Sequence, residues 1–217
     1  MVWYDLVVKK PNFDFEKQFQ ELGYSLIAGV DEVGRGSLAG PIVAGAVIFL
    51  DYSKMSLLRG ITDSKIISQL NREKYDRKIR KLAYDFAIGE VAEAEIDQMG
   101  IGAANILAFR RALDNLRKVD FALIDGRRFR GFTYKYLCLE KGELQSISIA
   151  AASIIAKVYR DAKMQNLPNG ELYGFNENKG YGCKKHFQAI EVHGPSSYHR
   201  KTFLRKIFEY QEKTRLF

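Results

Sequence analysis

Three acidic residues follow two apolar runs that predict buried strands. Asp31 and Glu32 come directly after residues 27–30, and Asp125 comes directly after residues 121–124. An acid at the end of a buried strand lowers stability unless its charge is compensated. Ligands of open α/β sheets bind beyond the strand ends, so two neighbouring strands would bring these carboxylates together. Crowded carboxylates raise one another's pKa unless a cation offsets them.

Such an oxygen-rich set of side chains favours hard divalent cations, and we expect Mg²⁺ or Mn²⁺. Pairs of these ions promote the hydrolysis of phosphodiesters. Each acid also has a structural interpretation. Asp31 could be a turn residue where the first strand opens, and Glu32 could face the opposite side of that strand. Asp125 before Gly126 is a common turn signal.

Positive charge is concentrated near the end of the chain. The 217 residues include 34 Lys and Arg against 26 Asp and Glu, for a net charge of +8. Residues 179–217 alone contain nine basic and three acidic residues. A basic segment of this kind suggests nucleic acid as the partner. The alternative is a solvated helical face that binds nothing.

Composition excludes several classes of protein. Hydrophobic residues make up 47% and charged residues 28%, which is typical of a globular domain and not of a disordered chain. We expect no membrane span, because no apolar run is long enough, and no secretory signal. Cys138 and Cys183 are the only cysteines. Two cysteines make no disulfide framework, so we expect a cytoplasmic protein.

The order of the predicted elements indicates an α/β sheet with a helical C-terminal part. The predicted strands are two within residues 26–50, then 85–92, 121–125 and 133–140. The predicted helices are 64–84, 103–118 and 146–160, followed by two near 184–192 and 196–213.

Two other kinds of site are suggested by parts of the sequence. GRGSLA at 34–39 matches the loose glycine pattern of dinucleotide-binding oxidoreductases. That motif requires a helix directly after the glycines, whereas Pro41 starts a second strand. A zinc site would use Cys183 with His186, His193 and His199, which lack the paired ligand spacing typical of zinc.

Six short motifs occur in a characteristic order. They are DEVGRGSLAGP at 31–41, TDSK at 62–65, LIDG at 123–126, AASIIAKVYRD at 151–161, KGY at 179–181 and HRKTF at 199–203. In order and approximate spacing they resemble bacterial type 2 ribonuclease H (ribonuclease HII). The resemblance implies a ribonuclease H-like mixed central sheet flanked by helices. It also implies a single catalytic domain over 1–217, in which 182–217 form a helical C-terminal extension.

The resemblance further implies an endonuclease that needs Mg²⁺ or Mn²⁺ and acts in ribonucleotide excision repair. Its expected partners are RNA–DNA hybrids, in which it hydrolyses the RNA strand, and duplex DNA with embedded single ribonucleotides, cut on their 5′ side. The products would carry a 3′-hydroxyl and a 5′-phosphate, and the enzyme would be a monomer. The alternative is a non-catalytic nucleic-acid-binding module on the same fold, which predicts binding without metal-dependent turnover.

The resemblance also implies residue roles. Asp31, Glu32 and Asp125 match three of the family's four catalytic, metal-binding acids. The fourth is usually an Asp in a Lys-Gly-Asp block, and here Glu143 takes that position. The longer side chain leaves the second metal position open, and Asp161 is a further candidate that we interpret as structural. Substrate binding is implied for Gly34, Arg35, Gly36, Ser64, Lys65 and Tyr181.

Overall fold

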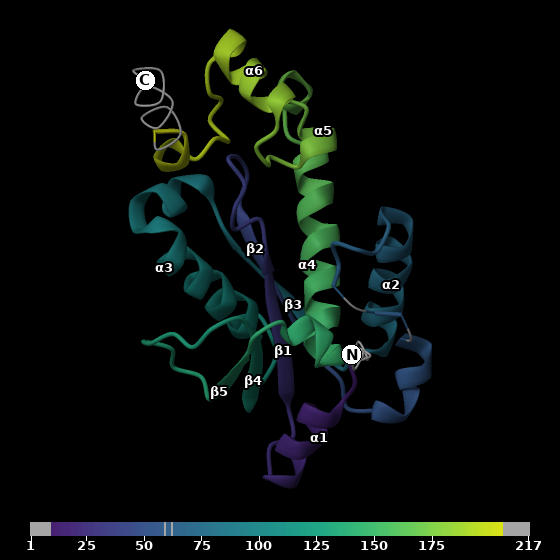
Figure 1. The fold of residues 1–217 in the computed structure, drawn as a ribbon. Coiled ribbons are helices and arrows are strands. Elements are labelled where there is room, and N and C mark those ends of the chain that lie inside the picture. The colour runs from purple at the N-terminus through teal and green to yellow at the C-terminus, as the bar shows by residue number, and fades with distance from the viewer. Residues whose placement is uncertain (1–9, 59, 62, 206–217) are drawn as a thin grey trace, which may run out of the picture.

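A five-stranded mixed sheet forms the centre of the computed structural model, which describes residues 10–58, 60–61 and 63–205 (Figure 1). Its strands are arranged in the order β3-β2-β1-β4-β5. They span Ile27–Val33 (β1), Ile42–Ile48 (β2), Asp85–Val91 (β3), Phe121–Asp125 (β4) and Tyr136–Leu139 (β5). β2 is antiparallel to both β1 and β3, whereas β1, β4 and β5 run parallel. The prediction of a mixed central sheet is confirmed.

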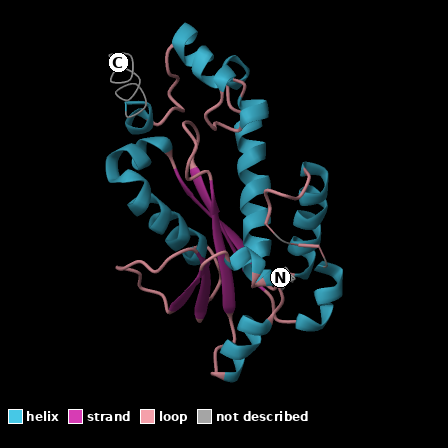
Figure 2. Ribbon diagram, in the orientation of Figure 1, coloured by secondary structure: helices cyan, strands magenta, loops and turns pink. Residues whose placement is uncertain are grey.

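Helices cover both faces of the sheet (Figure 2). Helix α3 (Glu93–Asp114) packs on one face, and α4 (Ile147–Gln165) packs on the other. Helix α2 (Gln69–Leu82) lies alongside α4. The remaining elements are α1 (Asp14–Glu21), α5 (Phe175–Asn178), α6 (Lys184–His193) and the 3₁₀ turns Tyr52–Leu58, Gly142–Leu144 and Gly170–Tyr173.

Glycines let α4 approach the sheet closely. A Cβ atom at Gly29 would lie 2.1 Å from the backbone carbon of Ser148, and one at Gly45 would lie 2.4 Å from the carbonyl oxygen of Ala152. Only glycine leaves room for such backbone contact. The close approach brings the side chains of α4 to the end of β1 that carries the acids.

The boundaries of three predicted elements are corrected. The helix predicted over 64–84 begins only at Gln69, because residues 64–66 form a turn in which the amide of Lys65 donates to Asp63 Oδ1. The helix predicted over 103–118 belongs to α3, which starts earlier, ends at Asp114 and is kinked at Gly100, where φ is 79°. The strand predicted over 133–140 is shorter, at 136–139.

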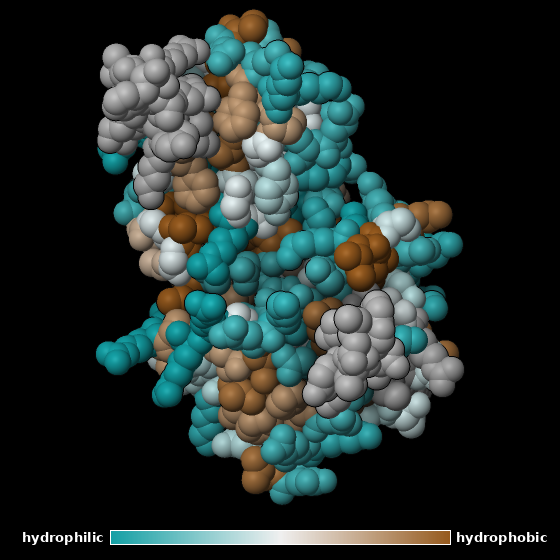
Figure 3. Space-filling view, viewed as in Figure 1, coloured by the Kyte–Doolittle hydropathy of each residue, from teal (hydrophilic) through white to brown (hydrophobic). Residues whose placement is uncertain are grey.

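The C-terminal helices pack onto the turn between β1 and β2. A cluster of buried apolar residues joins them, consisting of Leu38, Ala39, Met164, Tyr173, Phe175, Ile190 and Leu204. The last helix, predicted over 196–213, begins only at 201, because residues 197–198 form a turn and His199 forms a bridge with Ala39; residues 206–213 lie outside the described residues. Hydrophilic side chains cover much of the face in Figure 3. Among the described helices, none is long and apolar enough to cross a membrane.

Candidate active site

Asp31 and Glu32 lie inside β1, which continues to Val33, so the acids do not follow the strand and the interpretation of Asp31 as a turn residue is wrong. Successive side chains of a strand point to opposite faces of the sheet. Asp31 therefore faces α4, where Ser153 hydrogen-bonds to it, and Glu32 faces α3, where Asn105 hydrogen-bonds to it. Because the two side chains lie on opposite faces, they can contact one ligand only if it lies beyond the end of the strands.

Asp125 and Glu143 join them at that edge. The parallel pairing of β1 with β4 aligns the two apolar runs, so the acid that follows each run lies beside the other. Asp125 Oδ1 accepts a hydrogen bond of 2.7 Å from the amide of Gly142. Glu143 comes next in the chain, and its Oε2 atom is buried without a hydrogen-bond partner among the described residues. The structure thus gathers all four predicted acids.

The carboxylates disfavour one another's ionised forms. Burial raises the pKa of Asp31 well above its usual range, and the charges of Glu32 and Asp125 raise it further. Burial also raises the pKa of Glu32, although Arg35 opposes this effect with Nη1 3.8 Å from Oε1. Burial and then Asp125 raise the pKa of Glu143. A bound cation would reverse these effects, because it stabilises every ionised carboxylate near it.

The donors at this edge fit a hard divalent cation, since all of them are oxygen atoms and one, Glu143 Oε2, lacks a partner. They do not form a closed cage. Within the described part of the chain, no three His, Cys, Asp or Glu side chains are grouped closely enough to hold an ion as they stand. Binding would therefore require rotation of side chains whose backbone positions the sheet already sets.

A cleft of about 530 Å³ opens beside the acids. Eight of the predicted site residues line it: Asp31, Glu32, Gly34, Arg35, Gly36, Ser64, Lys65 and Tyr181. Partial burial lowers the pKa of Lys65, but Asp63, Asp31 and Glu143 outweigh that effect and raise it overall. Lys65 thus remains a cation that faces the carboxylates. The cleft combines negative charge at its base with positive charge at its rim.

Arg200 holds the glycine-rich turn from inside the protein. Its guanidinium is fully buried and donates to the carbonyl oxygens of Gly34 at 2.7 Å, Arg35 at 3.1 Å, and Gly40 at 2.7 and 2.9 Å. Burial, together with the charge of Arg160, lowers the pKa of Arg200 to about 10. The carbonyl groups of the turn replace the water that the guanidinium loses.

Arg160 of α4 makes a similar set of contacts. It donates to the carbonyl oxygens of Pro41 at 2.8 Å and Ala39 at 3.1 Å, and to Ser37 Oγ at 2.7 Å. Its third nitrogen donates to Lys179 O at 2.9 Å, in the loop that carries Tyr181. Arg160 therefore fixes the glycine-rich turn and the Tyr181 loop relative to one another.

These contacts orient the amides of the turn. The N–H and C=O groups of a trans peptide point in opposite directions, and the described chain has no cis peptide. Because the carbonyls of Gly34 and Arg35 point to Arg200, the amides of Arg35 and Gly36 point away from it, and both residues line the cleft. Neither amide has a hydrogen-bond partner among the described residues. Both are free to donate to a ligand.

The family model described as Ribonuclease HII matches residues 28–210, which contain all the predicted site residues. This chain belongs to the ribonuclease HII family. It is 44% identical over 209 residues to a ribonuclease HII of Clostridium botulinum, covering 94% of this chain and 77% of that relative. A ribonuclease HII of Clostridioides difficile is 42% identical over 195 residues, with coverage of 89% and 75%.

Solved structures agree with this assignment. The ribonuclease H2 of Pyrococcus horikoshii OT3 superposes with a TM-score of 0.69 at 27% identity, covering 87% of this chain and 99% of that one. Bst-RNase HIII, solved in complex with Mn²⁺, shares the fold with a TM-score of 0.57 at 20% identity, covering 78% and 63%. The ribonuclease H-like fold is confirmed. As a ribonuclease HII, the chain is a metal-dependent endonuclease of RNA–DNA hybrids.

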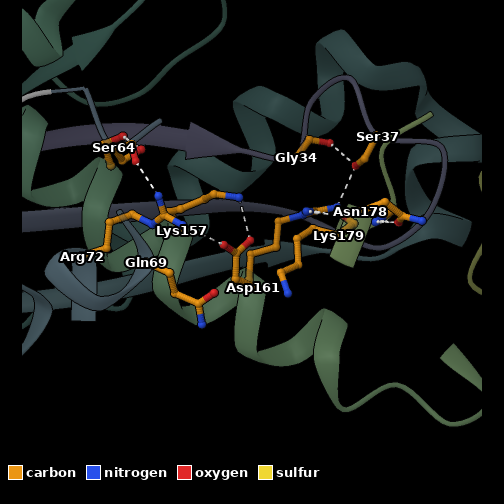
Figure 4. Close-up of polar contacts among 12 residues, drawn as sticks. Gly34, Ser37, Ser64, Gln69, Arg72, Lys157, Asp161, Asn178 and Lys179 are labelled. Atoms are coloured by element: carbon orange, nitrogen blue, oxygen red, sulfur yellow. Dashed lines mark hydrogen bonds and ion pairs between the residues drawn. The ribbon is translucent and has the colours of Figure 1, made fainter. Parts of the chain in front are cut away.

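In this ribonuclease HII, Asp161 is held by two cations. Lys157 Nζ lies 2.7 Å from Asp161 Oδ1, and Arg72 Nη2 lies 3.6 Å from Asp161 Oδ2. Arg72 also donates to Ser64 O at 3.0 Å (Figure 4). The ion pair of Arg72 with Asp161 therefore connects α4 to the loop before α2. These contacts favour the structural interpretation of Asp161.

Ser64 and Ser153 form a relay to Asp31. Ser64 is 4% exposed, and its Oγ lies 2.9 Å from Ser153 Oγ. Hydrogen bonding by Ser153 also opposes the rise in the pKa of Asp31, so Ser64 contacts the acid through Ser153. Sequence reasoning missed Ser153 and Lys157 as residues that line the cleft. Their spacing with Asp161 was the available signal, since residues four apart share one face of a helix.

Two of the three C-terminal histidines form a packed pair, and among the described residues no His and Cys side chains are grouped to hold a zinc ion. His186 Nε2 lies 3.0 Å from His199 Nε2, and burial lowers the pKa of His199 to about 4. Cys183 is exposed and free. The basic segment is also partly internal, since Lys179 and Arg200 are buried. Three of its cations, Lys206, Lys213 and Arg215, lie outside the described residues.

Proposed function

We propose that this ribonuclease HII cuts the RNA strand of hybrids, and also cuts 5′ to a single ribonucleotide in duplex DNA, at Asp31, Glu32, Asp125 and Glu143. One observation carries the proposal: the acids of β1 and β4 lie side by side next to a cleft that Gly34, Arg35 and Gly36 line with their backbone. Carboxylates supply a site for the cation, and amides beside them can distinguish RNA from DNA. We propose Mg²⁺ or Mn²⁺ as the cation.

Each side chain has a role that its position supports. A divalent cation held by the carboxylates would act as a Lewis acid toward the phosphate. The amides of Arg35 and Gly36 would donate to the 2′-oxygen, which is absent from DNA and lies in the shallow minor groove of a hybrid. Tyr181 would pack against the sugar. Lys65 would contact a neighbouring phosphate.

The domain organisation, oligomeric state and location of the protein are also proposals. We propose that residues 1–217 act as one catalytic domain and as a monomer, supported by the apolar cluster that joins the C-terminal helices to the glycine-rich turn. A cytoplasmic location is supported by the two cysteines, which are both free thiols.

The decisive experiment compares two labelled duplexes of the same sequence. One is all DNA, and the other contains one ribonucleotide. We expect cutting only of the second, on the 5′ side of the ribonucleotide, with Mg²⁺ or Mn²⁺ present and not with EDTA. Equal cutting of both duplexes, or cutting that persists in EDTA, would refute the proposal. The end groups of the products test the expected 3′-hydroxyl and 5′-phosphate.

Replacing Gly36 with alanine tests the amide contact. A Cβ at Gly36 would meet no atom within 4 Å, so the free energy of unfolding should change by less than about 0.5 kcal/mol. The methyl group would project from the turn beside the ligand. We expect KM for the one-ribonucleotide duplex to rise roughly tenfold, a loss of about 1.4 kcal/mol in binding.

Gly34→Ala is the matched control for Gly36→Ala. At Gly34 a Cβ would lie 2.2 Å from Arg160 Nε, and φ is +89°. That variant should lose stability as well as activity. A normal KM for Gly36→Ala in a steady-state assay would show that the turn does not touch the substrate.

The fourth acid is tested by comparing Glu143→Ala with Asp161→Ala. Glu143→Ala should lower kcat about a hundredfold, the effect of losing roughly 2.7 kcal/mol in the transition state. It should leave the melting temperature unchanged or higher, because an unpartnered buried oxygen is removed. Asp161→Ala should retain more activity but lower the melting temperature, because Lys157 and Arg72 lose their partner. The reverse ranking in single-turnover assays would make Asp161 the fourth acid.

A further inference from the structure

The loop from β4 to β5 carries cations that the proposed mechanism does not use. Residues 126–131 read GRRFRG and contain no acid. Arg127, Arg128 and Arg130 are exposed. The loop begins directly after Asp125 and projects beyond the sheet in Figure 1. It therefore places positive charge immediately next to a catalytic carboxylate.

Aromatic residues anchor this loop. Phe129 stacks on Tyr136 of β5 with ring centroids 5.0 Å apart, and the Tyr136 hydroxyl donates to Phe129 O. Phe132 packs edge-on against Phe129 at 5.2 Å. Arg110 of α3 donates to Gly131 O at 3.1 Å. Since Phe129 is anchored inward, the arginines on either side of it are presented to solvent on a braced backbone.

The arginines are available to an external anion. The Arg127 side chain is 86% exposed, and it pairs at 3.4 Å only with Glu140 among the described residues, itself 69% exposed. Such an exposed ion pair contributes little to stability, so Arg127 can exchange Glu140 for another anion. Arg127 and Arg128 line a cavity of about 420 Å³ together with Gly126, Tyr136, Leu137, Cys138 and Glu140. The loop thus combines a concave surface with two cations.

The strand order puts this cavity opposite the first cleft. Two of the acids, Asp31 and Asp125, lie on β1 and β4. The cleft with Lys65 and Tyr181 is lined by the end of β1, the turn after it and α4, whereas the arginine loop joins β4 to β5. Neighbouring strands are about 4.8 Å apart and β1 pairs directly with β4, so the loop begins roughly 6 Å from Asp31. Cations therefore flank the carboxylates on both sides. A nucleic-acid backbone that enters the cleft would continue over the loop.

We propose that the loop of residues 126–131 is a second phosphate-binding surface, at which Arg127 and Arg128 bind the backbone of the duplex beyond the scissile phosphate. The inference rests on the proposed function, because the duplex is positioned by the acids. Binding here would be independent of sequence, as is usual for contacts to phosphate. Its effect would fall on KM and on the salt dependence of binding, and not on kcat.

The test compares two double variants that remove the same charge at opposite ends of β4. One is Arg127→Gln with Arg128→Gln. The control is Arg117→Gln with Lys118→Gln, whose side chains are 75% and 73% exposed before the start of β4. Binding of a labelled RNA–DNA hybrid would be followed by fluorescence anisotropy in EDTA over a series of KCl concentrations.

We expect the loop variant to weaken binding roughly tenfold at low salt and to reduce the slope of log K against log salt by about 1 to 2. The control should match the parent protein. Equal binding by all three, or an equal loss in both variants, would overturn the inference. A parent protein that neither binds nor cuts the hybrid would contradict the proposed function instead. Thermal melts would establish that both variants are folded.

Discussion

Asp31→Asn is expected to abolish nearly all turnover and to make the fold more stable. The amide cannot hold a cation as a carboxylate does, and a thousandfold loss in kcat corresponds to about 4 kcal/mol of transition-state stabilisation. Stability should rise because Asp31 is a buried acid beside Glu32 and Asp125, whose charges disfavour its ionised form. An amide can still accept the hydrogen bond of 2.7 Å from the Glu32 amide.

The predicted gain in stability of Asp31→Asn should depend on pH. The pKa of Asp31 is raised in the folded state from its ordinary value of 3.8. The carboxyl group therefore costs the parent protein stability as pH rises above that value. In EDTA, the melting temperature of Asp31→Asn should exceed that of the parent by more at pH 8 than at pH 4. Added Mg²⁺ or Mn²⁺ should raise the melting temperature of the parent, because a ligand stabilises the state it binds, and should have less effect on the variant.

Asp76→Asn is the matched control. Asp76 is also a buried acid, but it lies on α2 and pairs with Arg80 at 2.9 Å. Its replacement should leave kcat unchanged and should lower the melting temperature slightly. If Asp31→Asn kept more than about a tenth of the parent kcat, a loss of less than about 1.4 kcal/mol, Asp31 would not be a metal ligand.

Arg200→Gln is expected to destabilise the protein by about 5 kcal/mol, at the upper end for a single substitution. Its guanidinium makes four hydrogen bonds to three carbonyl oxygens of the glycine-rich turn. Hydrogen bonds from a charged donor contribute about 1.5–3 kcal/mol each, and carbonyl groups left without a donor add a further cost. The loss would appear as a lower denaturation midpoint in urea.

The same substitution should weaken recognition of the ribonucleotide. Without Arg200, the carbonyl of Arg35 loses its donor and that of Gly34 keeps the bond of 2.8 Å from Ser37 Oγ, so the peptides that carry the amides of Arg35 and Gly36 are held less firmly. At temperatures where the variant is folded, KM for the one-ribonucleotide duplex should therefore rise more than kcat falls. A larger effect on KM than on kcat distinguishes a positioning role of Arg200 from a general loss of folded enzyme.

Two further variants control for stability and charge. Arg200→Lys keeps the charge but not the planar set of donors, so it should recover only part of the lost stability. Arg80→Gln removes a partly exposed pair and should cost less than about 1 kcal/mol. If Arg200→Gln were no less stable than Arg80→Gln, the hydrogen bonds of Arg200 to the glycine-rich turn would not stabilise the fold.

Local sequence determined where most strands lie and which residues can do chemistry. The apolar runs of β2 and β4 and the alternating pattern of β3 are set by burial on one or both faces of a sheet, and this pattern is visible in one dimension. The acids after the runs at 27–30 and 121–124 could be identified for the same reason. The motif order identified the family, and with it Glu143 and Tyr181.

Tertiary structure decided where β1 ends, which distant residues contact one another, and which charged side chains are buried. β1 continues through Asp31 and Glu32 because β2 supplies hydrogen-bond partners there, and no local pattern encodes that pairing. Ser64 meets Ser153, and Arg200 meets Gly34, across separations of 89 and 166 residues. Side-chain periodicity is a property of neighbours in sequence, whereas burial and hydrogen bonding depend on which distant segments the fold brings into contact. A basic residue such as Arg200 could therefore be read as a cation for nucleic acid until its surroundings were known.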